Sequence, residues 1–172
     1  MIAQKEIPES AYQRAFQYEA KLGSCPQCVL AALNETLDVG NESIFQASQG
    51  LSGGTALSSQ GSCGALAGGI IAISTVVGRS HQEFIEGQRK RLVFKYTKLL
   101  YDRFIKEYGS PLCCDVQKKL FGRSYILLDK QEYEAFEKAG AHVDKCPSVA
   151  GNVAKWTAEI ILNKINPEHF QK

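Results

Sequence analysis

Four of the six cysteines in this sequence stand where neighbouring serine or proline residues predict the start of a helix: Cys25, Cys63, Cys113 and Cys146. A thiolate, rather than a thiol, binds metals and attacks electrophiles. The unpaired N–H groups and the dipole at a helix N-terminus stabilise negative charge, so we expect a lowered pKa at each of these thiols. If the four helix starts converge, they form a pocket suited to an anionic centre with four thiolates.

Several chemistries use cysteines placed in this way. An iron–sulfur cluster held by four cysteines fits the set, and so does a structural zinc ion with four cysteines. A cysteine can also be a small buried hydrophobic residue with no chemical role. These alternatives stay open at the level of the residues.

The remaining cysteines leave room for thiol–disulfide chemistry without metal. Cys25 and Cys28 form a C-x-x-C motif, but residues 15–22 before it have a helical pattern, whereas a thioredoxin-like site follows a strand. Position 29 is Val rather than His, which excludes covalent haem attachment at this motif. Cys113 and Cys114 are adjacent, so we expect one to be a ligand and the other a redox partner or a simple packing residue.

No other catalytic signature is present. The sequence lacks a Ser-His-Asp pattern, a phosphate-binding loop and a dinucleotide fingerprint. His142 lies four residues before Cys146 and could approach the site, whereas His81 and His169 are expected at solvated positions. We assign no catalytic residue and expect an electron-transfer or accessory redox protein rather than a stand-alone enzyme.

Composition limits the class of protein. The 172 residues are 44% hydrophobic and 22% charged, with a net charge of +2, so we expect neither a nucleic-acid partner nor a membrane surface. The first ten residues have no apolar signal region, and we expect a cytoplasmic protein whose thiols stay reduced.

Apolar periodicity predicts helices along nearly the whole chain. We expect an all-α, single-domain helical bundle of about six to eight helices over residues 1–172. One apolar stretch, 62–78, is too short and too rich in small residues to span a membrane, and we interpret it as a buried core helix. The run 124–128 is the one strand-like segment, with no evident partner. Helices are predicted at about 9–22, 25–37, after Asn41, 62–78, 82–108, 112–120, 130–138 and 147–165.

The order of four separated motifs resembles the C_GCAxxG_C_C family of small redox-active proteins. These motifs are a Cys-x-Gln-x-Val that begins at Cys25, the run Cys63-Gly64-Ala65-Leu66-Ala67-Gly68, the segment 104–110 that leads into Cys113, and Cys146-Pro147. The resemblance covers roughly residues 20–160 and maps the family cysteines onto Cys25, Cys63, Cys113 and Cys146. Cys28 and Cys114 depart from the family pattern.

The family is similar to the iron–sulfur part of split-Soret cytochromes c, which are helical dimers. That resemblance implies an iron–sulfur site without haem and a homodimer. Our first hypothesis is a small redox protein that binds a [2Fe–2S] or [4Fe–4S] cluster, transfers or senses electrons, and acts with an oxidoreductase or another redox protein. The alternatives are a metal-free thiol–disulfide protein and a structural zinc-binding interaction module.

Overall fold

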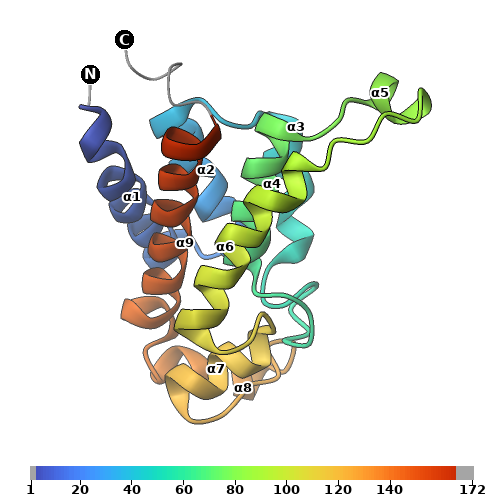
Figure 1. Cartoon of the computed structure of the whole chain (residues 1–172). Coiled ribbons are helices and arrows are strands. Elements are labelled where there is room, and N and C mark those ends of the chain that lie inside the picture. The colour runs from blue at the N-terminus through green and yellow to red at the C-terminus, as the bar shows by residue number, and fades with distance from the viewer. Residues whose placement is uncertain (1–2, 166–172) are drawn as a thin grey trace.

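The computed structural model describes residues 3–165, which are helical throughout most of their length (Figure 1). Within these residues there is no β-strand, only one isolated antiparallel bridge, so the predicted all-α class is confirmed. Short 3-10 segments occur at Gln4–Glu6 and Gln49–Leu51, and π-helical segments at Ala141–Lys145 and Ile161–Ile165. The α-helices are α1 (Ile7–Leu22), α2 (Cys25–Leu37), α3 (Glu42–Ser48), α4 (Gly64–Val77), α5 (His81–Ile85), α6 (Leu92–Tyr108), α7 (Cys113–Phe121), α8 (Lys130–Lys138) and α9 (Cys146–Ile160).

Helix α9 lies at the centre of the bundle and packs against α1, α2, α4 and α6 (Figure 1). Close packing between α4, α6 and α9 depends on Gly69. A Cβ there would lie 2.7 Å from Leu100 on α6 and 2.7 Å from Val153 on α9. The predicted buried helix at 62–78 is therefore confirmed as α4, which contributes Leu66 and Ile73 to the core.

The predicted long helix over 82–108 is wrong, because the chain forms two helices there. Helix α5 begins with a capping box between Ser80 and Glu83 and ends before Gly87, whose φ of +72° is incompatible with a continuing helix. The segment that carries α5 projects away from the bundle (Figure 1). Packing against the core therefore does not stabilise a continuous helix there. Arg89, Lys90 and Arg91, which follow α5, are exposed.

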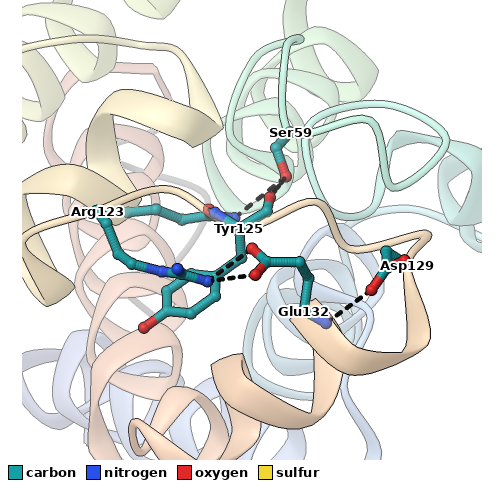
Figure 2. A network of polar contacts seen from close by, with 6 residues as sticks. Ser59, Arg123, Tyr125, Asp129 and Glu132 are labelled. Atoms are coloured by element: carbon teal, nitrogen blue, oxygen red, sulfur yellow. Dashed lines mark hydrogen bonds and ion pairs between the residues drawn. The ribbon is translucent and has the colours of Figure 1, made fainter.

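The predicted strand-like run 124–128 is also wrong and forms a loop. Its backbone has no neighbouring strand and uses side-chain partners instead. The Tyr125 N–H donates to Gln117 Oε1 at 2.8 Å, and the Tyr125 carbonyl accepts from Ser59 Oγ at 2.9 Å. Figure 2 shows this Ser59 contact and, beside it, Arg123 paired with both carboxylate oxygens of Glu132.

A second, smaller core lies where α7 and α8 meet the start of α9. Its buried members are Tyr125, Leu127, Phe136 and Ala141, and the half-buried Cys146 packs against them. This cluster fixes α7 and α8 at one end of the bundle (Figure 1), where both contribute to the wall of the cavity described below.

Of the helices between residues 3 and 165, none is both long enough and apolar enough to cross a membrane.

Candidate functional site

Each of the four cysteines selected from the sequence stands at the start of a different helix, as predicted. Cys25, Cys113 and Cys146 are the first residues of α2, α7 and α9, and Cys63 immediately precedes α4. All four line a single cavity of about 170 Å³ at the end of the bundle. Residues that are up to 121 positions apart in the sequence therefore line the same cavity.

Cys63 and Cys113 are held together by the isolated antiparallel bridge between Ser62 and Leu112. The Cys63 N–H donates to the Pro111 carbonyl at 2.7 Å, and the Cys113 N–H donates to the Gly61 carbonyl at 3.0 Å. Two helix starts from distant parts of the chain are thus held side by side by backbone hydrogen bonds, which do not depend on the identity of the side chains.

Cys25 lies close to the start of α4. A Cβ on Gly64 would lie 2.9 Å from Cys25 Sγ, so the absence of a side chain at Gly64 allows this approach. The backbone N–H of Gly53 lowers the pKa of Cys25, although other effects outweigh it. Ser24 precedes α2 as expected, but its hydroxyl donates to Gln27 Oε1 at 2.8 Å instead of capping the backbone.

The expected lowering of the thiol pKa values is wrong. Burial raises the pKa of Cys63 to about 11 and that of Cys113 to about 12, and it raises the pKa of Cys25 and Cys146 well above the usual range. The backbone N–H groups of Ala65 and Leu66 do favour the Cys63 thiolate, as a helix start should. The effect of these N–H groups is smaller than that of desolvation. Removing a charge from water costs several kcal/mol, whereas a helix terminus stabilises it by about 0.3–1 kcal/mol.

Cys28 and Cys114 do not line the cavity. Cys28 Sγ donates to the Gly23 carbonyl at 2.8 Å, and burial together with the nearby Glu19 raises its pKa. Cys114 Sγ lies 3.8 Å from Asp115 Oδ1. Both cysteines are buried and occupy packing positions behind the helix starts.

Two ionisable residues of the cavity wall were not among the sequence-predicted site residues. Glu19 on α1 is only 2% exposed, and its Oε2 atom has no hydrogen-bond partner. His142 places Nε2 at 3.8 Å from Glu19 Oε1 and Nδ1 at 2.6 Å from Glu137 Oε1. The sequence placed His142 only as a residue that could approach the site. A signal for Glu19 was present, since it continues the buried stripe of Ile7, Ala11 and Ala15 at four-residue intervals.

Gln117 connects the cavity to the loop structure behind it. Its Nε2 atom lies 3.5 Å from Cys113 Sγ and 3.3 Å from Ser59 Oγ, and its Oε1 atom accepts from the Tyr125 N–H. Because the Gln117 side chain is almost fully buried and both of its ends are engaged, the amide is held in a fixed orientation toward the Cys113 sulfur.

The loop between α3 and α4 contributes Gly53 and Leu57 to the cavity wall. Residues 53–57 all have positive φ, including Thr55 at +65°, Ala56 at +51° and Leu57 at +57°. Each non-glycine residue in this left-handed conformation costs roughly 1–2 kcal/mol. Hydrogen bonds at the end of this strained loop hold it in place. There the buried Ser59 contacts the Tyr125 carbonyl and the Gln117 amide.

The cavity is poor in positive charge. Four thiols, the Glu19 carboxyl group and the His142 ring are its ionisable or metal-binding groups apart from Tyr133, and neither Lys nor Arg lines it. Within residues 3–165, no group of three or more His, Cys, Asp or Glu side chains has the arrangement that a single metal ion requires. The thiols surround a volume rather than meeting at one point.

Comparison with known proteins bears on the origin of this arrangement. Residues 24–160 match the family model described as "Putative redox-active protein (C_GCAxxG_C_C)", and that range contains all four cavity cysteines. The chain belongs to the C_GCAxxG_C_C family. Membership in a family with this redox-active description agrees with a cavity lined by thiols. Neither a curated protein nor a solved structure matches this C_GCAxxG_C_C protein.

Proposed function

We propose that this C_GCAxxG_C_C protein binds an iron–sulfur cluster, [2Fe–2S] or [4Fe–4S], through its four cavity cysteines and uses it for electron transfer or redox sensing. The observation that carries the proposal is that Cys25, Cys63, Cys113 and Cys146 line one cavity from four separate helix starts. The other two cysteines lie outside it.

The chemistry of the cavity wall supports a cationic guest that binds sulfur. Buried thiols and a buried carboxyl group without Lys or Arg neighbours would repel one another once ionised, and bound iron would compensate their charge. The N–H groups of Gly53, Ala65 and Leu66, together with the Gln117 amide, would donate hydrogen bonds to the ligand sulfurs. Such donors are among the features that set the reduction potential of a cluster.

The arrangement of the thiols does not fit a single zinc ion. Four sulfurs bound to one tetrahedral zinc at about 2.3 Å lie roughly 3.8 Å from one another. No group of side chains between residues 3 and 165 meets the requirement for one ion. A cluster distributes its cysteine ligands over several irons, which suits thiols that line a larger cavity.

Anaerobic purification, reconstitution with iron and sulfide, and analysis of iron and acid-labile sulfide test the proposal. Serine substitution of any cavity cysteine, for example Cys63→Ser, should greatly reduce both contents. The matched controls Cys28→Ser and Cys114→Ser should retain them. A colourless wild-type protein without iron after reconstitution would refute the proposal, and thiol titration with zinc analysis would then separate the metal-free disulfide protein from the zinc protein.

We further propose that an oxidoreductase or another redox protein exchanges electrons with the cluster, and that two copies of the chain form a homodimer. Sedimentation analysis of the loaded protein tests the dimer. A monomer at micromolar concentration would contradict it without affecting the cluster.

A further inference from the structure

Glu19 occupies a position that ordinary core packing does not explain. It lies on the buried face of α1, in line with Ala11 and Ala15, where an apolar residue would continue the stripe. Its side chain instead brings a carboxyl group to the wall of the four-cysteine cavity. Placing this polar group at 2% exposure is costly unless something inside the protein binds it.

The two carboxyl oxygens of Glu19 differ in their surroundings. Oε1 faces His142 Nε2 at 3.8 Å, whereas Oε2 is buried without a hydrogen-bond partner. Desolvation raises the pKa of Glu19, whereas hydrogen bonds from the thiols of Cys28 and Cys25 and the nearby His142 oppose the rise. The His142 ring cannot serve both oxygens, because its other nitrogen is engaged by Glu137 Oε1 at 2.6 Å.

Protonation of Glu19 does not supply the hydrogen-bond partner that Oε2 lacks. An ionised Oε2 would be an unpaired buried charge, and a protonated one would be a buried O–H group without an acceptor; each leaves a polar atom unsatisfied at a cost of about 1–3 kcal/mol or more. No Lys or Arg lines the cavity to supply a partner. Apart from the thiols of Cys25 and Cys28, which contact the carboxyl group, the source of a partner is a guest inside the cavity.

We propose that Glu19 is a fifth protein ligand of the metal centre in this cavity and binds iron through Oε2 alongside the four cysteines. This inference rests on the proposed cluster. Formation of the iron–oxygen bond adds one ligand to an iron that keeps its cysteine, so no other bond to iron breaks. The carboxyl proton, where one is present, goes to solvent, and no electron is transferred. A carboxylate oxygen is a hard ligand that iron accepts, so a mixed set of sulfur and oxygen donors gives one iron an environment unlike the others.

His142 and Glu137 orient this carboxylate. His142 comes from the π-helical segment just before Cys146, and its contacts join Glu19 on α1 to Glu137 on α8. A positioned imidazole beside a ligating carboxylate fixes which oxygen is free to bind metal, as outer partners do for metal ligands generally.

Mössbauer spectroscopy of ⁵⁷Fe-reconstituted protein tests the ligand directly. Wild type should show a minor iron component with the larger isomer shift of oxygen ligation, and Glu19→Gln should lose that component. Glu9→Gln, which alters an exposed carboxylate of the same helix outside the cavity, should keep it. We also expect Glu19→Gln to release iron to a chelator on the order of 10-fold faster than Glu9→Gln.

A second measurement needs no variant that could fail to fold. Wild type labelled with ¹³C at its glutamate carboxyl groups should show ¹³C hyperfine coupling to the paramagnetic cluster. A wild-type cluster with normal iron and sulfide contents but no oxygen-ligated component and no ¹³C coupling would overturn the ligand role and leave the proposed function standing. Failure of wild type to bind iron and sulfide at all would overturn both.

Discussion

Gly64 and Cys25 lie so close together that a single added carbon at Gly64 would stand 2.9 Å from the Cys25 sulfur. The same carbon would also stand 2.9 Å from Pro26 Cδ and 3.0 Å from the Leu51 carbonyl, so little room exists for adjustment. Gly64→Ala should therefore displace Cys25 from the cavity, lower the cluster content, and reduce the free energy of unfolding by about 1–3 kcal/mol. Iron analysis and urea unfolding measure the two effects.

Gly50→Ala is the matched control for this substitution. A Cβ at Gly50 meets no atom within 4 Å, and its backbone does not have a positive φ. This variant should keep its iron. Equal iron contents in the two variants would show that close approach at Gly64 is unnecessary.

Glu19 should make the stability of the metal-free protein depend on pH. Its folded pKa is raised by burial, so between the unfolded value near 4.5 and the folded value the native state holds a proton that the unfolded chain has released. The contribution of Glu19 to the free energy of unfolding is therefore fully present below pH 4.5, and it is lost as the pH rises through the folded pKa. Urea unfolding of reduced protein between pH 4.5 and 7.5 should show Glu19→Gln gaining stability relative to wild type as the pH increases.

The exposed Ala56 offers a test of the strained loop. Its φ of +51° suits glycine, so Ala56→Gly should raise the free energy of unfolding by about 0.5–1 kcal/mol after the greater flexibility of unfolded glycine is subtracted. The same change at Ala47, an exposed residue of α3, should lower it by about 1 kcal/mol. Thermal unfolding measures whether each variant gains or loses stability. Destabilisation by both substitutions would contradict the left-handed conformation of Ala56.

Gln117→Leu should be strongly destabilising despite its similar size. The buried Tyr125 N–H would lose its acceptor, which costs about 1–3 kcal/mol, and Ser59 and Cys113 would each lose a donor. Gln60→Leu, at an exposed position of the neighbouring loop, should change the free energy of unfolding by less than about 0.5 kcal/mol. A loss of similar size in both variants would count against the network.

The four cysteines could be found from the sequence because their signals are local. A proline or serine within two residues of each cysteine, including Pro111 before Cys113, indicates a helix start whatever the rest of the chain does. The thiol pKa values could not be found in this way. They depend on how deeply the helix starts are buried, which only the assembled bundle determines.

The other differences have tertiary causes as well. Periodicity alone joined α5 to α6, although the turn at Gly87 ends the first helix. Residues 124–128 have strand-forming side chains but no strand beside them, so Gln117 and Ser59 serve their backbone instead. The stripe of Ile7, Ala11 and Ala15 pointed to Glu19, but a carboxylate on a helix is ordinarily solvated. Its burial follows from the packing of α9 against α1.

The cavity wall is built from distant parts of the chain, which has a consequence for biosynthesis. The backbone bridge brings Cys63 beside Cys113, and Glu19 lies far along the chain from Cys146. A growing polypeptide cannot enclose the cavity until Cys146 has emerged and α9 has docked on α1, because the last wall belongs to that helix. A guest that needs all four cysteines could therefore bind only at a late stage of folding, after Cys146 has joined the other three.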